Sequence, residues 1–177
     1  MSENTPAKPL INIADVELQP RSAAYAAAGE AATKYDARMG MIAPRIGAKL
    51  LGYNITAVPP GMRAFPHHNH LVNEEMFFVL EGSGELRIGE GTHPVRAGDI
   101  IACPPGGPET AHQLVNTGDV ELRYLAVSTQ LSPEVCQYPD SDKFAVSVSN
   151  ATGTAGQPWR FRHVGHVSDA RDYWEGE

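Results

Sequence analysis

Three histidines and one glutamate have the types and spacing of metal ligands. His68 and His70 are two residues apart, so in a strand their side chains point to the same face. Glu75 follows at the start of the apolar run EMFFVLEG, and a turn at LVN would bring this run back beside the first strand. His112 begins a later strand-like run. Three imidazoles and one carboxylate could therefore converge on one point.

This set of three nitrogens and one oxygen predicts a site for one divalent transition metal. Imidazole-rich donor sets suit Fe, Mn, Ni, Co or Zn, whereas Ca and Mg prefer oxygen ligands. Such a set leaves adjacent positions of an octahedral metal open to water, oxygen or a pair of substrate oxygens. Because one carboxylate leaves the cation with net positive charge, we expect an anionic or chelating ligand such as a carboxylate, an enediol or a keto acid.

Short β-like runs separated by turn residues must position these side chains. The segment KLLGYNITAVPPG predicts a strand that ends in a Pro-Pro-Gly turn, and residues 76–107 predict three or four strands joined at glycines. The segment AHQLVNTGDVELRYLAVST predicts a hairpin with Asn-Thr-Gly-Asp as its turn. Closely spaced strands of this kind favour an all-β antiparallel sandwich or barrel.

The same alternation predicts the wall of the pocket. If Glu75 points inward, so do Phe77 and Val79, and if His112 points inward, so does Leu114. The wall is then largely apolar and aromatic, as small-molecule sites usually are. No residue is identified by its pattern as a catalytic acid or base.

The stretch GMRAFPHHNHLVNEEMFFVLEG resembles the first motif of the cupin superfamily. His70, Glu75 and Gly82 have the gaps of that motif, whereas Gly61 precedes His68 by one residue more than the motif allows. The six-residue gap before Gly82 selects Glu75 over the glutamate that precedes it.

The stretch GDIIACPPGGPETAHQLVN resembles the second cupin motif. Gly98, Pro104 and Gly106 fit this motif, and Asn116 follows His112 at the motif's distance. Five residues instead of two separate Gly106 from His112, so the loop before the third histidine is longer than the motif.

The resemblance covers roughly residues 48–130 and is to small bacterial single-domain cupins of unassigned function. It implies a double-stranded β-helix (jelly-roll) barrel as the core of the protein. It also implies that the metal ligands are His68, His70, Glu75 and His112.

Two flanking segments are expected to complete this single domain. Residues 1–47 are polar with an alanine-rich patch and should form an N-terminal arm that packs on the barrel. Residues 131–177 should form a C-terminal extension that completes or covers the barrel. Tyr173 and Trp174 indicate a tail that docks on its own barrel or on a neighbouring subunit, so we expect a homodimer.

Composition excludes several partners. The chain has 14 Lys and Arg against 21 Asp and Glu, a net charge of −7, with no basic run, so nucleic acid and anionic membranes are not expected partners. Its apolar stretches are far shorter than the ~20 residues that a membrane span needs. Cys103 and Cys136 form no Cys-x-x-Cys motif, so we expect reduced thiols, a structural role for Cys103 and a cytoplasmic location.

The remaining histidines are not expected to bind the metal. Adjacent residues of a strand point to opposite faces, so His67 and Glu74 should point away from the site. His93, His163 and His166 are expected on the surface.

Three functions remain open at this point, because one fold with one metal site hosts many reactions. The leading hypothesis is a metalloenzyme that acts on a small oxygen-rich molecule, with oxygenase, isomerase, lyase and decarboxylase chemistry all possible. The alternative is a non-enzymatic module that binds or senses a small molecule through the metal. The third is a metal that only stabilises the barrel.

Overall fold

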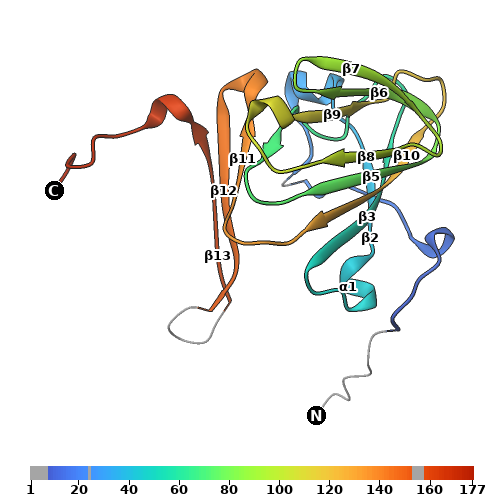
Figure 1. Cartoon of the computed structure of the whole chain (residues 1–177), viewed down its shortest axis with the longest axis horizontal. Helices are drawn as coiled ribbons and strands as arrows, with labels where there is room; N and C mark the ends of the chain where they lie inside the picture. Colours follow the sequence, from blue (N-terminus) through green and yellow to red (C-terminus); the bar gives the residue numbers. More distant parts are fainter. Residues whose placement is uncertain (1–7, 24, 153–157) are drawn as a thin grey trace, which may run out of the picture.

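The computed structural model describes residues 8–23, 25–152 and 158–177 (Figure 1). The chain consists mostly of β-strands with few and short helices, and the strands pair antiparallel in three sheets. The predicted all-β class is therefore confirmed.

The largest sheet forms one wall of the molecule. Its six strands are Gln19–Pro20 (β1), Arg38–Met41 (β2), Leu51–Val58 (β3), Leu122–Thr129 (β10), Glu75–Glu81 (β5) and Ile100–Cys103 (β8). They lie side by side in the order β1-β2-β3-β10-β5-β8.

Two smaller sheets complete the fold. One has the order β7-β6-β9, with strands Gly91–Arg96 (β7), Ser83–Ile88 (β6) and His112–Val115 (β9). The other has the order β13-β12-β11-β4, with strands Pro158–His166 (β13), Lys143–Thr152 (β12), Glu134–Tyr138 (β11) and Asn69–His70 (β4). An isolated bridge between His68 and His112 connects the two. In Figure 1, β11, β12 and β13 stand at one side of the barrel.

The helices are short. The one α-helix among the described residues is Ala43–Ile46 (α1), and it ends at Gly47, whose φ of 76° is the left-handed conformation that favours glycine. The 3-10 helices are Ile13–Asp15, Gly29–Thr33, Pro108–Thr110, Pro139–Ser141 and Val167–Asp169. Within the described ranges, no helix has the length and apolarity needed to cross a membrane.

The main apolar core lies inside the barrel. Val58, Val79 and Leu122 are fully buried there. On β10, Leu122, Tyr124 and Ala126 are buried in alternation, because successive side chains of a strand point to opposite faces. This inward-facing set of β10 side chains contributes to the core.

The N-terminal segment is held by both pairing and packing. Its strand β2 pairs with β3 and so extends the large sheet. Val16 is buried with Ile42 and Ile55 in a second apolar cluster. A Cβ at Gly40 would lie 2.3 Å from Val16 Cγ1, so this close approach requires a glycine.

The hairpin predicted over residues 111–129 is wrong. Strand β9 pairs with β6, whereas β10 pairs with β3 and β5, so the two runs belong to different sheets. The segment between them is a corner, in which Asn116 Nδ2 donates to the carbonyl oxygens of Val58 and Val120. Turn residues between alternating runs occur in both hairpins and corners, so the local pattern could not distinguish them.

The C-terminal tail lies away from the barrel. Tyr173 and Trp174 are 83% and 72% exposed, and their main aromatic contact is with each other at a ring distance of 4.9 Å. Figure 1 shows this segment continuing outward from the end of β13. Of the two docking modes expected for the tail, packing on its own barrel is not observed in this structure.

The core packing predicts a large difference between two leucine substitutions. Leu122→Ala leaves a cavity at a fully buried position, so the free energy of unfolding should fall by about 2–5 kcal/mol. Leu50→Ala, at a side chain 71% exposed, should change it by less than about 0.5 kcal/mol. Urea denaturation of the two variants measures both values, and equal losses would contradict the assigned core.

Candidate metal centre

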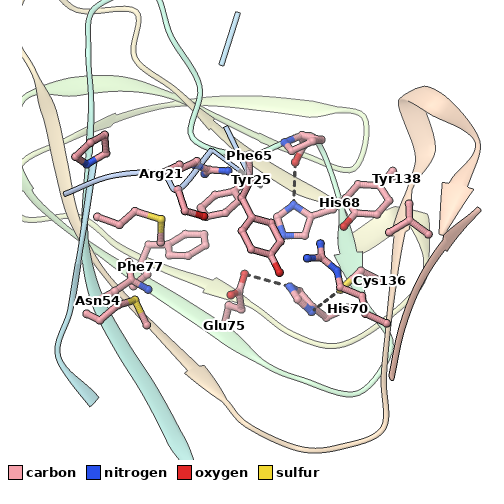
Figure 2. A pocket seen from close by; sticks show the side chains of 18 of the residues that line it. Arg21, Tyr25, Asn54, Phe65, His68, His70, Glu75, Phe77, Cys136 and Tyr138 are labelled. Atoms are coloured by element: carbon pink, nitrogen blue, oxygen red, sulfur yellow. Dashed lines mark hydrogen bonds and ion pairs between the residues drawn. The ribbon is translucent and has the colours of Figure 1, made fainter. Parts of the chain in front are cut away.

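The structure brings the four predicted ligands together. The ligand atoms of His68, His70, Glu75 and His112 all lie within 4.8 Å of one another, and Figure 2 shows the first three facing a common cavity. His112 Nε2 lies 3.0 Å from Glu75 Oε2, and His70 Nε2 lies 3.4 Å from it. Adjacent donors around a cation with bonds of about 2.1 Å are about 3 Å apart, so this spacing fits a metal ion.

The four side chains come from opposite walls of the barrel. Glu75 begins β5 in the large sheet, whereas His70 is in β4 and His112 begins β9 in the two small sheets. His68 is paired with His112 by two backbone hydrogen bonds of 3.2 and 2.8 Å, and their ring centroids are 4.8 Å apart. The centre therefore lies where all three sheets meet.

Two of the histidines have their Nδ1 atoms fixed by backbone carbonyl oxygens. His68 Nδ1 lies 2.8 Å from the oxygen of Pro66, and His112 Nδ1 lies 3.2 Å from the oxygen of Thr110. A carbonyl oxygen only accepts, so each Nδ1 carries the proton when the ring is neutral. The lone pair of each ring is then on Nε2, the atom directed at the cluster.

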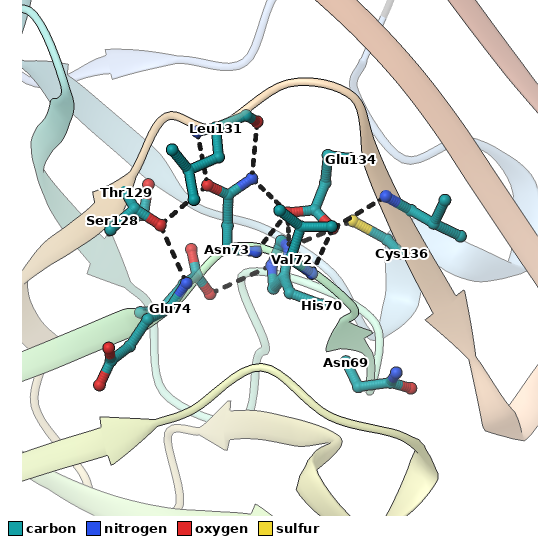
Figure 3. Close-up of polar contacts among 12 residues, drawn as sticks. Asn69, His70, Val72, Asn73, Glu74, Ser128, Thr129, Leu131, Glu134 and Cys136 are labelled. Atoms are coloured by element: carbon teal, nitrogen blue, oxygen red, sulfur yellow. Dashed lines mark hydrogen bonds and ion pairs between the residues drawn. The ribbon is translucent and has the colours of Figure 1, made fainter.

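The third histidine is oriented by a buried carboxylate (Figure 3). His70 Nδ1 lies 3.5 Å from Glu134 Oε2 and 3.3 Å from Cys136 Sγ. The Glu134 carboxylate also accepts hydrogen bonds from the backbone N–H groups of Val72, Asn73 and Val135 and from the side chain of Asn73. A second potential metal group consists of His70, Glu134 and Cys136. The Glu134 carboxylate is already engaged by these donors. We therefore interpret Glu134 as the residue that orients His70 and not as a metal ligand.

The chemistry of the cluster fits a metal ion. His70 Nε2 is buried and, within the described part of the chain, makes no hydrogen bond, because its 3.4 Å contact with Glu75 Oε2 lacks hydrogen-bond geometry. Buried polar atoms of native proteins are almost always satisfied. A cation among the four ligands would supply the missing partner, and its donor set of three nitrogens and one oxygen suits a divalent transition metal.

The charges within the cluster are tightly coupled. Burial and the charge of His112 lower the pKa of His68 to about 4, against the opposing effect of Glu75, so this ring is neutral near pH 7. Burial opposes ionisation of Glu75, but contacts with His112 and His70 outweigh it and hold the pKa of Glu75 below its usual range. For His70, burial is outweighed by contacts with Cys136 and Glu75, which raise its pKa to about 10. A bound cation would replace the His70 proton beside Glu75.

A cavity of about 880 Å³ opens beside the cluster. Phe77 lines it, as the alternation of the strand predicted. Val79 and Leu114, predicted as further lining residues, are 0% and 5% exposed and lie in the apolar core. Val79 lies two residues beyond Phe77 and Leu114 two residues beyond His112, so both pack into the core and do not line the cavity.

Both flanking segments contribute polar residues that the sequence analysis did not identify. Arg21 and Tyr25 reach the cavity from the N-terminal segment, and Tyr138, Lys143 and Arg162 reach it from the C-terminal one. Figure 2 shows the first two and Tyr138 around the metal ligands. No local pattern marks these residues, because only the long-range packing of both segments brings them to the site.

Other residues lie as expected. Glu74 is exposed, as are His93, His163 and His166. Cys103 is 1% exposed, and burial raises its pKa to about 12, which agrees with a structural thiol.

Comparisons with known proteins agree with this fold and site. Residues 54–128 match the model of the cupin domain family. An uncharacterized protein from Methanocaldococcus jannaschii is 35% identical over 71 residues, and an oxalate-binding protein from Thermotoga maritima is 31% identical over 70 residues. Each alignment covers 40% of this chain and 54% of the relative, so the chain spans about half the length of these curated relatives.

A solved structure has the same fold over nearly the whole chain. The putative sugar phosphate isomerase from Acidithiobacillus ferrooxidans superposes with a TM-score of 0.73 and 20% identity, covering 93% of this chain and 96% of that one. The sheet topology, the domain match and this superposition together define a double-stranded β-helix protein. The chain therefore contains a cupin domain, at residues 54–128, within this fold.

The ligand cluster predicts the effect of removing two imidazoles. The double variant His70→Ala/His112→Ala should bind no stoichiometric metal, because two of the four donors are lost. Elemental analysis after reconstitution with Mn, Fe, Ni, Co or Zn measures this. His93→Ala, at an exposed histidine, should retain the metal content of the wild type. Metal retained by the double variant would show that the cation binds elsewhere.

The carboxylate that orients His70 predicts a weaker effect. Glu134→Gln places an amide N–H₂ group beside the backbone N–H donors that the carboxylate accepted. His70 should then lose its fixed orientation, and the metal affinity should fall about 10–100-fold. A competition titration against a chelator measures the affinity, and thermal melting of the metal-free protein separates it from lost stability. Glu81→Gln, at a carboxylate 62% exposed, is the matched control. An unchanged metal affinity in Glu134→Gln would contradict the proposal that Glu134 orients His70.

Proposed function

We propose that this cupin is a metalloenzyme acting on a small anionic or chelating molecule at His68, His70, Glu75 and His112. One observation carries the proposal. The three imidazoles have acceptors at Nδ1 and direct Nε2 toward one carboxylate, beside a cavity of about 880 Å³. A cavity of this size fits a small molecule, whereas a purely structural metal would be enclosed by protein ligands.

The residues around the site have separate roles in this proposal. A divalent metal bound there supplies Lewis-acid chemistry and positions a pair of ligand oxygens. Phe77 and the apolar wall limit access of water. Burial raises the pKa of Tyr138, so its hydroxyl stays protonated and donates a hydrogen bond to an anionic ligand. The Tyr138 ring also stacks beside His68, with centroids 6.1 Å apart.

A second candidate function is metal-dependent binding without turnover. The relative from Thermotoga maritima, 31% identical over 70 residues, is an oxalate-binding protein. Oxalate presents two adjacent oxygens and negative charge, which is the ligand chemistry expected at a cation held by three histidines and one glutamate. Binding and catalysis would use the same donors, so they differ only in whether the ligand is changed.

Titration of the metal-loaded protein with oxalate tests the site. Oxalate should bind to the Mn-loaded wild type and to His93→Ala, and binding should be lost in the metal-free protein and in His112→Ala. Calorimetry measures these affinities. Oxalate binding that survives removal of the metal would overturn the proposed site.

Proton NMR of substrate mixtures separates the two candidates. Small hydroxy acids, keto acids and hydroxy aldehydes incubated with the metal-loaded protein should be chemically changed, and His112→Ala should abolish the change. Ligands that bind but stay unchanged would favour the binding module over the enzyme.

We further propose a cytoplasmic homodimer. Both cysteines are free, which fits a reducing compartment. Phe161 and Val164 of β13 are 43% and 48% exposed, and the tail beyond them exposes Tyr173 and Trp174. Exposed apolar side chains gathered on one segment are typical of an interface.

The mass in solution tests the dimer. Sedimentation equilibrium at micromolar concentration should give twice the chain mass of 19.1 kDa. The double variant Tyr173→Ser/Trp174→Ser should shift the equilibrium toward the single chain. A wild type with the mass of one chain would contradict the proposal.

A further inference from the structure

A second lobe adjoins the cavity beside the metal ligands. This second lobe has a volume of about 430 Å³. Arg21, Tyr25, Pro66 and Lys143 line both spaces and thus form the boundary between them. The two cavities are therefore adjacent along this boundary.

Two cations lie at this boundary. Among the ion pairs formed by the described residues, none includes Arg21 or Lys143. The Arg21 guanidinium stacks over the Phe65 ring at 4.2 Å and donates to the carbonyl oxygen of Ala64, so packing holds it in place. Positive charge concentrated in a cavity of a chain with a net charge of −7 indicates an anionic ligand.

The acidic residue of the second lobe does not cancel this charge. Asp140 is the one carboxylate among the described residues that line it. Its Oδ2 accepts a hydrogen bond of 2.6 Å from Arg87, which therefore neutralises it from outside the lobe. Neither Lys143 nor Arg21 has an ion-pair partner of its own among the described residues.

A buried histidine also lines the second lobe. His67 is 3% exposed, and its Nδ1 lies 3.6 Å from Asp140 Oδ1, so His67 and Arg87 flank the same carboxylate. Because both ring nitrogens of His67 are inaccessible, this side chain forms part of the wall and does not donate to a ligand. Ser141 adds a hydroxyl to the same wall.

We propose that the second lobe binds the phosphate end of a ligand whose oxygen-rich other end lies at the metal centre. A phosphate dianion accepts several hydrogen bonds and pairs well with both arginine and lysine. Arg21, Lys143 and Ser141 supply two cations and a hydroxyl. The substrate class is then a small phosphorylated hydroxy acid or sugar, and this inference rests on the proposed metal centre for the other end.

A matched pair of ligands tests the second lobe. Glycerate and 3-phosphoglycerate share an α-hydroxy acid that can chelate a metal, and only the second has a phosphate. Calorimetry with the Mn-loaded protein at constant ionic strength should show 3-phosphoglycerate binding at least about tenfold more tightly. Lys143→Gln should reduce the ratio of the two affinities, because any effect on the shared hydroxy acid cancels in this ratio. Lys49→Gln, at an exposed lysine outside both lobes, is the control and should leave both affinities unchanged.

The outcomes separate this inference from the proposed function. Equal affinities of the two ligands for the wild type, or an advantage that survives both Lys143→Gln and Arg21→Gln, would overturn the phosphate site alone. An equal loss in Lys49→Gln would assign the effect to overall charge and also overturn it. Failure of glycerate to bind the metal-loaded protein would contradict the metal-dependent function. Binding of 3-phosphoglycerate to the metal-free protein through Lys143 would then still support the phosphate lobe.

Discussion

The backbone pairing of His68 with His112 is the contact on which the site depends. It joins the sheet of β6, β7 and β9 to the strand pair of β4 and β11, and it places two imidazoles side by side. Carbonyl oxygens then fix both rings at Nδ1, so their orientation follows from the backbone itself. Glu75 completes the set from the opposite wall. The metal centre is thus a product of how the sheets meet, and every ligand depends on that junction.

The flanking segments give the cavity its positively charged residues. The barrel motifs alone provide ligands and an apolar wall, whereas Arg21 and Lys143 come from outside the two motifs. The N-terminal segment is fastened by β2 pairing and by Val16, and the C-terminal one by β11 pairing with β4. Charge in the cavity therefore depends on how both flanks are attached, and the C-terminal attachment is made at the ligand His70 itself. This arrangement lets one barrel host different ligands by changing its flanks.

The sequence was most informative where chemistry follows strand alternation. His68, His70, Glu75 and His112 could be predicted because their types and spacing repeat a motif, and the all-β class followed from short runs and turns. Depth along a strand has no such signal, so Val79 was predicted as pocket wall but lies in the core. The pairing partners of β9 and β10 could not be read locally either, since they depend on contacts distant in sequence. The same limit concealed the residues of both flanks.

The network around Asn73 and Glu134 has a consequence for metal selectivity. Asn73 Oδ1 accepts hydrogen bonds from Thr129 Oγ1 and the Leu131 N–H, while its N–H groups bind Glu134. The short segment between His70 and Glu75 is thereby immobilised before any cation arrives. Most of the conformational entropy of assembling the ligands is lost during folding rather than on binding. A rigid donor set of fixed radius then discriminates among cations by size and preferred geometry, because it cannot contract or expand to suit a different ion.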